Sequence, residues 1–416
     1  MHLKIEKSLI VNRQSKVTIT GSKSESNRLL LLQALYPELQ LENVSNSDDS
    51  KVMSKALTSK ESVIDIHHAG TAMRFLTAYF SIQEGRETVL TGSKRMKERP
   101  IQILVEALQQ LGADISYVEN HGFPPLKIKG KKLIKNKVSL NANVSSQYIS
   151  ALLLIASKLE NGIELALEGE ITSVPYIDMT LSLLNEIGIE THFENNKIAV
   201  KPFAQKGQSL KSNFQNPITV ESDWSSASYY FSIAALCKVG TQITLSSYKN
   251  NSLQGDSVLV DIYKHFGVET VFGNNEITLQ KTETQNLKSK IELNLKNAPD
   301  IAQTIAVTCF ALGLPCDLTG LHTLKIKETD RLVALKTEIE KLGGEVNITD
   351  KSLHLKAAAV IKSNISIATY NDHRMAMAFA PLALKVPIII ENFMEVSKSY
   401  PTFWDDLKQL GFKVLE

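Results

Sequence analysis

Apolar residues fill several helix-length stretches of this chain so completely that no polar face remains for solvent. Residues 28–35 and 149–156 are the clearest cases. A helix that is apolar all round is buried inside its domain. The sequence therefore predicts buried helices that open near Ser22, Gly70, Ser145, Asp223, Asp300 and Asp372.

Amphipathic helices alternate with the buried ones, and a glycine closes each of them. These glycines recur at intervals of 68 to 79 residues, at Gly112, Gly188, Gly267, Gly343 and Gly411. Glycine readily adopts the left-handed conformation that ends a helix. After the first four, alternating residues around a tight turn predict a hairpin, as at 189–193 and 197–200.

One supersecondary unit, repeated along the chain, explains this spacing. Each unit holds a buried helix, a strand, an amphipathic helix and usually a hairpin; there are six units, and the first is short. The chain of 416 residues is too long for one ordinary core. We therefore expect two similar α/β lobes of three units each, at residues 21–220 and at 1–20 with 221–416. No flexible linker appears near 220–223, so we expect a short hinge there.

Small, hydroxylated or charged residues precede the buried helices. A helix N-terminus offers unpaired N–H groups and the positive end of the helix dipole, which favour phosphate or carboxylate. If the helices of a lobe are parallel, their starts meet on one face, and two such faces across a hinge form a cationic cleft. The pattern therefore predicts a site for a multiply anionic substrate.

The overall charge limits the partners that we expect. Lys and Arg number 46 and Asp and Glu 44, for a net charge of +2. A nucleic-acid surface normally needs a basic excess, so we expect no nucleic-acid partner. The three cysteines follow no disulfide or metal spacing. Neither a signal peptide nor a membrane span is evident, and we expect a cytoplasmic monomer without a membrane partner.

No metal or redox cofactor is expected. His67 and His68 are adjacent, and neighbouring residues on a strand point in opposite directions. No glycine-rich nucleotide-binding motif accompanies them. The polar run 45–50 is typical of turns and helix caps, and we interpret Asp256 as structural.

Many segments, in order from residue 21 to about 403, resemble the 5-enolpyruvylshikimate-3-phosphate synthase family of enolpyruvyl transferases. They are GSKSESNR (21–28), HAGTAMR (68–74), RMKERPI (95–101), VSSQY (144–148), PYID (175–178), NSLQGD (251–256), KETDR (327–331) and YNDHRMAM (370–377). One such match is a weak signal, but this many in register are specific. The resemblance implies a two-lobed inverted, or inside-out, α/β barrel of six βαβαββ-type units, three per lobe. That count agrees with the spacing above.

The resemblance also implies a reaction without a cofactor. The enolpyruvyl group of phosphoenolpyruvate passes to the 5-hydroxyl of shikimate-3-phosphate, and phosphate leaves. The residues implied for shikimate-3-phosphate are Lys23, Ser24, Arg28, Ser145, Ser146, Gln147, Ser173, Tyr176, Asp300, Thr323 and Lys327. Those implied for phosphoenolpyruvate are Lys23, Gly70, Arg99, Gln147, Arg331, Arg374 and Lys398. Guanidinium groups bind planar carboxylates and phosphates through paired hydrogen bonds.

The implied chemistry needs two proton-transfer roles. One group gives a proton to C3 of phosphoenolpyruvate and later takes one back, and Glu328 and Lys23 are the candidates. A base at the 5-hydroxyl is the second role, for which Asp300 is the candidate. His373 is expected to assist.

The chain departs from the family pattern at four positions. Asn is usual at His68 and Thr323, Pro at Phe75 and Arg at Lys325. The shorter Thr323 puts one substrate contact in doubt. Our hypothesis is that Phe75 changes sensitivity to glyphosate, the family inhibitor that mimics phosphoenolpyruvate.

Three alternatives stay open at this point. The sister transferase that acts on UDP-N-acetylglucosamine shares the fold, but it uses a loop cysteine, and here the cysteines lie in or beside apolar helices. An RNA-end-processing enzyme built from related repeats is opposed by the near-neutral charge. A non-catalytic paralogue is opposed by the presence of Lys23, Asp300, Glu328, Arg374 and Lys398.

Overall fold

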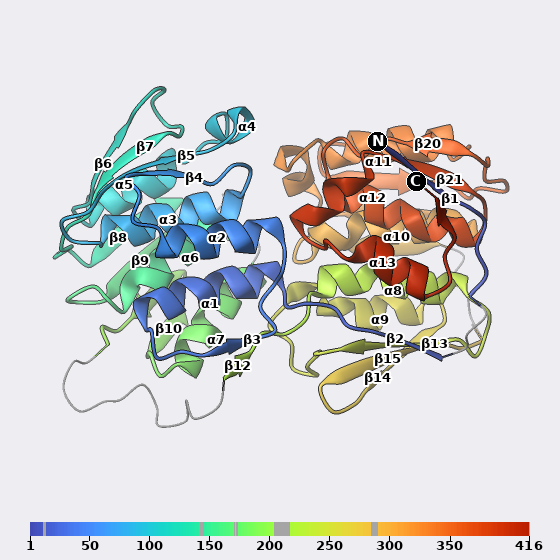
Figure 1. Ribbon diagram of the computed structural model, residues 1–416, viewed down its shortest axis with the longest axis horizontal. Coiled ribbons are helices and arrows are strands. Elements are labelled where there is room, and N and C mark those ends of the chain that lie inside the picture. The colour runs from blue at the N-terminus through green and yellow to red at the C-terminus, as the bar shows by residue number, and fades with distance from the viewer. Residues whose placement is uncertain are drawn as a thin grey trace. The chain divides into compact units, whose positions relative to one another are not determined.

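The computed structural model divides into two compact units, which we describe separately (Figure 1). Ser22–Val220 forms the inserted unit, and Met1–Gly21 with Glu221–Glu416 forms the composite unit. The structure describes residues 1–10, 14–141, 145–169, 171, 174–203, 217–283 and 290–415.

Helices and strands alternate along the inserted unit. Its helices are α1 (Lys23–Leu35), α2 (Asp48–Thr58), α3 (Gly70–Ser81), α4 (Lys94–Lys97), α5 (Gln102–Gln110), α6 (Ser146–Ala156) and α7 (Val174–Glu186). Its strands are β3 (Leu41–Glu42), β4 (Val63–Asp65), β5 (Glu87–Thr91), β6 (Asp114–Tyr117), β7 (Leu126–Lys129), β8 (Lys137–Asn141), β9 (Ile163–Glu168), β10 (Thr191–Glu194), β11 (Lys197–Val200) and β12 (Ile218–Thr219).

The composite unit repeats that alternation. Its α-helices are α8 (Trp224–Leu236), α9 (Leu259–Lys264), α10 (Ala302–Leu312), α11 (Arg331–Lys341), α12 (His373–Phe379) and α13 (Phe403–Gln409). Short 3₁₀ helices are η1 (Gly255–Val258), η2 (Pro299–Ile301), η3 (His322–Ile326), η4 (Ala380–Leu384) and η5 (Phe393–Lys398). Its strands are β1 (His2–Ile5), β2 (Gln14–Val17), β13 (Gln242–Ser246), β14 (Val268–Phe272), β15 (Glu276–Lys281), β16 (Ile291–Asn294), β17 (Cys316–Thr319), β18 (Val346–Ile348), β19 (Ser352–Leu355), β20 (Ile365–Ile367), β21 (Ile388–Glu391) and β22 (Val414–Leu415).

The sheets confirm the sixfold repeat. The four-stranded sheets have the orders β4-β5-β7-β6, β8-β9-β11-β10, β2-β13-β15-β14, β16-β17-β19-β18 and β20-β21-β1-β22. Each has one parallel pairing followed by two antiparallel ones, as in β4 with β5, then β5 with β7 and β7 with β6. Among the described residues, β3 and β12 make only the parallel pairing, as expected for a short first unit.

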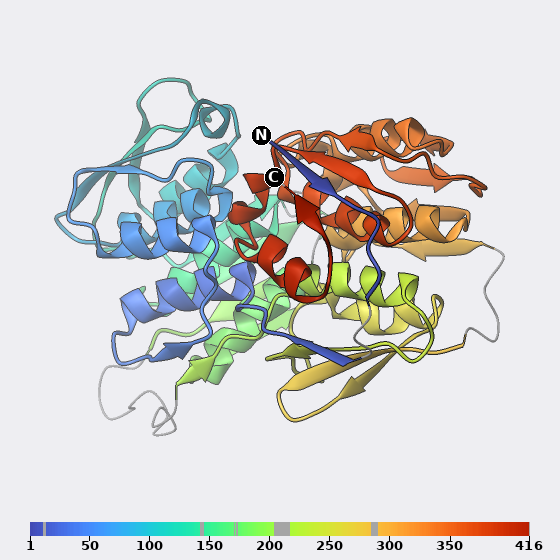
Figure 2. The ribbon, with the colours of Figure 1, turned by 45° about the vertical axis from the view of Figure 1, so that its right-hand side comes forward.

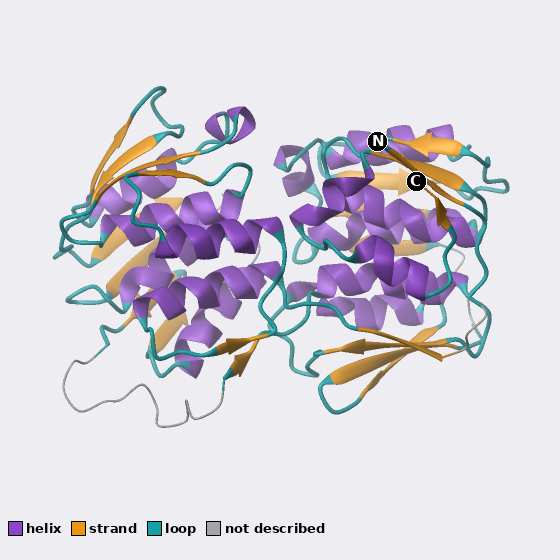
Figure 3. Cartoon of the chain, viewed as in Figure 1, coloured by secondary structure: helices purple, strands orange, loops and turns teal. Residues whose placement is uncertain are grey.

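Helices occupy the middle of each unit, and strands lie around them (Figure 3). The predicted buried helices begin where expected: Ser22, Ser145, Asp223 and Asp372 are the residues that immediately precede α1, α6, α8 and α12. Every residue of α3 is buried, and two of its hydroxyl groups are satisfied by the helix backbone: Thr77 donates to the Met73 carbonyl (2.6 Å) and Ser81 donates to the Ala78 carbonyl (2.6 Å). No helix in the described ranges is long and apolar enough to cross a membrane.

The N-terminal segment supplies two strands of the composite unit. β1 lies between β21 and β22, and β2 pairs in parallel with β13. Figures 1 and 2 both show the blue β1 beside the red end of the chain.

One predicted hairpin differs from expectation. The hairpins after Gly188, Gly267 and Gly343 are confirmed. After Gly112, residues 118–125 join β6 to β7 in place of a tight turn. Proline has no N–H to continue a ladder, and Pro124 and Pro125 delay regular pairing until Leu126, which lies opposite Tyr117.

Candidate active site

Arg28 is a buried cation of the inserted unit whose hydrogen-bond acceptors, among the described residues, are all neutral. It lies in the second turn of α1 and is 2% exposed. Its Nε donates to Thr180 Oγ1 (2.8 Å), and Nη2 donates to Ser150 Oγ (2.9 Å). Its Nη1 donates to the Ser24 carbonyl (2.7 Å), and Cζ lies 5.8 Å from the centre of the Tyr176 ring. All these acceptors are neutral. Burial lowers the pKa of Arg28 to about 10, although the charge of the nearby Glu25 opposes this shift.

Gly70 begins α3 and lies against Arg99. A Cβ atom added at Gly70 would stand 2.5 Å from Nη1 of Arg99, so glycine lets the guanidinium approach the backbone. Arg74 donates to the carbonyls of Gly70 (3.0 Å) and Pro100 (3.3 Å), which ties the start of α3 to the segment that carries Arg99. Burial and the charge of Arg99 lower the pKa of Arg74 to about 10.

The start of α6 meets the start of α3. Gln147 Nε2 donates to Thr71 Oγ1 (3.2 Å), and the Ser145 hydroxyl accepts from the Gln147 N–H (3.4 Å). Ser146 is buried and Ser145 is exposed. Ser173 lies outside the described residues.

The first turns of α1 and α3 carry no side-chain cap. Neither Ser22 before α1 nor Ala69 before α3 makes a capping hydrogen bond through its side chain. The N–H groups of these first turns therefore suit an anionic ligand. Lys23, at the start of α1, lies 3.5 Å from Oδ2 of Asp49.

In the composite unit, the buried Arg331 is surrounded by three carboxylates. It begins α11 and is 2% exposed. Its Nε donates to Asp372 Oδ2 (2.6 Å), and Nη1 donates to Asp300 Oδ1 (2.8 Å). Its Nη2 donates to Glu328 Oε2 (2.9 Å). The three negative charges outweigh burial and raise the pKa of Arg331. Arg331 and Glu328 are therefore not merely a surface pair.

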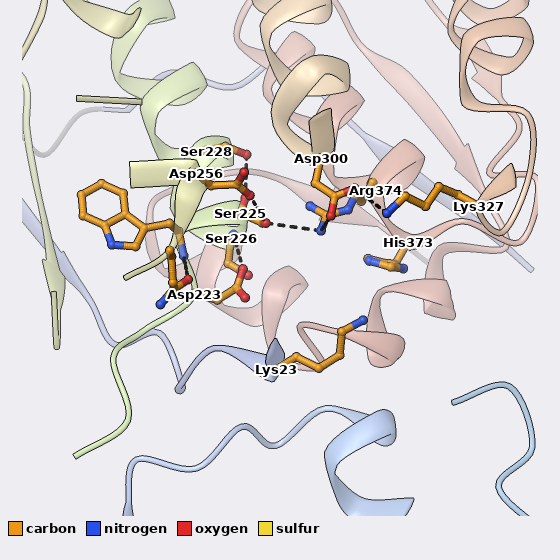
Figure 4. Close-up of polar contacts among 12 residues, drawn as sticks. Lys23, Asp223, Ser225, Ser226, Ser228, Asp256, Asp300, Lys327, His373 and Arg374 are labelled. Atoms are coloured by element: carbon orange, nitrogen blue, oxygen red, sulfur yellow. Dashed lines mark hydrogen bonds and ion pairs between the residues drawn. The ribbon is translucent and has the colours of Figure 1, made fainter. Parts of the chain in front are cut away.

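Asp300 attracts two further cations (Figure 4). Lys327 Nζ lies 3.4 Å from Oδ1, and Arg374 Nη2 lies 3.3 Å from Oδ2. Asp300 precedes α10, while Arg374 lies in the first turn of α12. The starts of α10, α11 and α12 thus converge, as predicted for helices within one unit.

Three other predicted residues lie in segments of this unit that flank the cluster. His373, the first residue of α12, is 2% exposed, with Nδ1 3.9 Å from Asp372 Oδ1. Lys398 Nζ donates to the Asn371 carbonyl (2.7 Å). Thr323 Oγ1 is buried and has no hydrogen-bond partner among the described residues. In the same ranges, no group of three His, Cys, Asp or Glu side chains could hold a metal ion.

The sequence reasoning missed several residues of these clusters. Arg74 lies within a quoted motif but was given no role. Asp372 caps α12 by accepting from the Arg374 N–H (2.9 Å), a position recognisable before an apolar helix. Ser225, which has no role in the sequence analysis, accepts from Arg374 and donates to Asp256, which the sequence analysis interprets as structural. Burial and the charge of Asp300 raise the pKa of Asp256 to about 7.

Comparisons with known proteins agree on one family. Residues 55–407 match the family model for EPSP synthase (3-phosphoshikimate 1-carboxyvinyltransferase). A 3-phosphoshikimate 1-carboxyvinyltransferase of Bacteroides fragilis (strain YCH46) is 46% identical, over 96% of each chain. One from Histophilus somni (strain 2336) is 34% identical, over 98% of this chain and 99% of the relative. The solved EPSP synthase of Acinetobacter baumannii, 21% identical, shares the fold with a TM-score of 0.80 over the whole of both chains.

Proposed function

This chain belongs to the EPSP synthase (3-phosphoshikimate 1-carboxyvinyltransferase) family, and from that premise we propose the reaction that it catalyses. The enolpyruvyl group of phosphoenolpyruvate passes to the 5-hydroxyl of shikimate-3-phosphate, and phosphate is released. This is a step in the shikimate pathway of aromatic amino-acid biosynthesis. The observation that carries the proposal is the convergence of Asp300, Glu328, Arg331 and Arg374 at the helix starts of one unit.

The inserted unit supports the proposal through its charge. The two substrates together carry about −5 to −6 charges in two phosphates and two carboxylates. Arg28 and Arg74 are buried, and among the described residues their guanidinium groups donate only to neutral acceptors. A substrate anion would place additional negative charge beside each guanidinium, and the pKa of each would rise.

Shikimate-3-phosphate is assigned on this basis to residues of both units. In the inserted unit these are Lys23, Ser24, Arg28, Ser145, Ser146, Gln147, Ser173 and Tyr176; in the composite unit they are Asp300, Thr323 and Lys327. The hydrogen bonds around Arg28 support the first group, because Ser150 and Thr180 hold the guanidinium in place.

Phosphoenolpyruvate is assigned to Lys23, Gly70, Arg99, Gln147, Arg331, Arg374 and Lys398. The contact between Arg99 and the backbone at Gly70 supports this, since it places a guanidinium at an uncapped helix start. Arg331 retains an N–H on Nη1, because only Asp300 accepts from that nitrogen among the described residues.

In the proposed chemistry, C3 of phosphoenolpyruvate is protonated while the 5-hydroxyl attacks C2, and phosphate then leaves with loss of a C3 proton. Glu328 or Lys23 transfers the proton at C3, and Asp300 accepts the hydroxyl proton, with His373 assisting. Glu328 has 32% of its side chain exposed and is oriented by Arg331, which suits a group that must meet a substrate. The surrounding cations stabilise the charge that develops in the transition state.

Phe75 is proposed to alter sensitivity to glyphosate. Its buried ring lies with its centre 5.4 Å from Cζ of Arg28, one turn along α3 from Gly70. A ring at this position packs on the guanidinium of Arg28, which we propose binds shikimate-3-phosphate. Equal inhibition of this protein and of a relative that carries Pro at this position, titrated side by side, would contradict the hypothesis.

We also propose that the enzyme works as a cytoplasmic monomer without a metal. The three cysteines are free, and two of them are buried, as is common where thiols stay reduced.

Phosphate release by the purified protein tests the proposed reaction. The expected result is release that requires both phosphoenolpyruvate and shikimate-3-phosphate, proceeds without added metal, and forms the enolpyruvyl product detected by mass spectrometry. Release with UDP-N-acetylglucosamine instead of shikimate-3-phosphate would overturn the substrate assignment. No release with either acceptor would overturn the activity.

A further inference from the structure

Asp256 is a buried carboxylate that the resemblance leaves without a role. It lies in η1, between β13 and α9, and is 6% exposed. The Ser225 hydroxyl, in the first turn of α8, donates to Asp256 Oδ2. Ser225 is itself 9% exposed, so this hydrogen bond is largely shielded from water.

The same hydroxyl accepts a hydrogen bond from Arg374. Nη2 of Arg374 lies 3.3 Å from Ser225 Oγ and 3.3 Å from Asp300 Oδ2 (Figure 4). A hydroxyl has one hydrogen, and donation to Asp256 leaves Ser225 with only acceptor lone pairs for Arg374. Asp256 therefore keeps the serine hydrogen turned away from the guanidinium, whose N–H groups can only donate.

The charges around Asp256 make this arrangement sensitive to protonation. Asp300 and Asp223 disfavour the charged carboxylate and Arg374 favours it, and together with burial they raise the pKa of Asp256 to about 7. A protonated Asp256 can donate to Ser225. The serine hydrogen is then free to turn toward the guanidinium, which it would repel.

We propose that Asp256 is a positioning residue that, through Ser225, holds the Arg374 guanidinium in the orientation that phosphoenolpyruvate requires. The proposal rests on the proposed function, because it takes Arg374 to be a ligand of that substrate. It adds Ser225 as a second acceptor beside Asp300 at Nη2, so that two groups hold this nitrogen before substrate binds.

Steady-state kinetics of Asp256→Asn, Ser225→Ala and the double variant test the proposal. Asp256→Asn keeps the shape and removes the charge. We expect each single variant to raise KM for phosphoenolpyruvate about tenfold, the size of a lost hydrogen bond in a charged network. KM for shikimate-3-phosphate should change less than twofold. Both residues act on Arg374 through the same hydrogen bond. The double variant should therefore have a KM for phosphoenolpyruvate no higher than that of the more impaired single variant.

A second readout separates positioning from a structural role. The pH profile of kcat/KM for phosphoenolpyruvate should lose its inflection near pH 7 in Asp256→Asn. The matched control is Asp406→Asn, another buried carboxylate of the composite unit that accepts from a hydroxyl, that of Thr402 (3.0 Å). It should leave both KM values unchanged. If Asp256→Asn does not fold, Ser225→Ala alone must show the selective rise in KM.

Each outcome discriminates. The positioning role would be overturned if KM for phosphoenolpyruvate were unchanged in folded Asp256→Asn or Ser225→Ala. It would also be overturned if the two effects multiplied in the double variant, or if KM rose equally for both substrates. Absence of turnover by the unchanged protein would overturn the proposed function and this inference with it.

Discussion

Arg28 in the inserted unit and Arg331 in the composite unit are equally buried, each 2% exposed, but their surroundings are opposite. Arg28 donates to hydroxyls and carbonyls, and its pKa falls to about 10. Arg331 donates to three carboxylates, and its pKa rises.

The difference separates two uses of a buried cation. A buried guanidinium that donates only to neutral acceptors is stabilised further when an anion arrives, so it favours binding. One that is already neutralised holds the acidic groups around it at fixed positions, so it favours proton chemistry. Under the proposed function, Arg28 would therefore serve mainly to bind an anion, whereas Arg331 would serve mainly to arrange the acidic groups around it.

Replacing Arg331 gives the largest expected effect. Arg331→Met leaves three buried or half-buried carboxylates without their partner, and the free energy of unfolding should fall by about 3–5 kcal/mol. Urea denaturation measures this, and turnover should be lost as well. Arg95→Met, which breaks an exposed pair with Glu98, is the control and should change stability by about 0.5 kcal/mol or less. A loss of stability no larger than the control's would show that the three carboxylates around Arg331 do not need it as a partner.

Replacing Arg28 should separate binding from stability. In Arg28→Met the neutral acceptors can bond to one another, as Ser150 and Thr180 already do (2.9 Å), so the melting temperature should stay level or rise. KM for shikimate-3-phosphate should rise about 30-fold or more, because a buried charge partner of the substrate is gone. Kinetics and thermal unfolding on the same sample check both. A melting temperature that falls as far as that of Arg331→Met would erase the distinction between the units.

A pH series extends the comparison to a buried acid. The raised pKa of Asp256 means that the folded protein keeps this proton up to about pH 7, whereas an unfolded aspartate loses it near pH 4. Stability from this site is therefore present below about pH 4 and is lost as pH rises to about 7. The measured quantity is the melting temperature of Asp256→Asn minus that of the unchanged protein. This difference should increase by about 5 °C between about pH 4 and about pH 7. Exposed Asp405→Asn is the control, and a flat difference for Asp256→Asn would contradict the environment described here.

The smallest effect concerns a neutral buried group. Gln303 in α10 is fully buried, and neither amide atom has a partner among the described residues. Gln303→Met keeps the volume and removes the unsatisfied polar atoms, so it should stabilise the protein by about 1 kcal/mol. Chemical denaturation measures the gain, and Gln303→Glu should instead destabilise. A loss of stability in Gln303→Met would indicate that the amide is satisfied in solution.

Local patterns predicted much of the fold. The helix starts at Ser22 and Asp223 and the closing glycines are signals within a few residues, and the repeat follows from their spacing. The connection 118–125 was not predicted as such, because the strand pattern near Gly112 does not show where pairing resumes after two prolines.

The chemistry of the site was less visible in the sequence. KETDR marks Arg331, but its partners Asp300 and Asp372 come from distant segments. The cluster of carboxylates around Arg331 therefore forms only when three helix starts meet. The neutral acceptors of Arg28 are harder still to foresee, because Ser150 and Thr180 come from two other helices. Asp256 ends a recognised motif, yet only its contact with Ser225 relates it to Arg374.

The way in which Met1–Gly21 completes the composite unit has a consequence for the order of folding during synthesis. β1 is synthesised before the other described strands, whereas its neighbours β21 and β22 are the last two of them. Ser22–Val220 is continuous and can fold while its partner is still incomplete. The first strands must therefore remain unpaired for most of translation, and trimming them would remove sheet strands and not a dispensable tail.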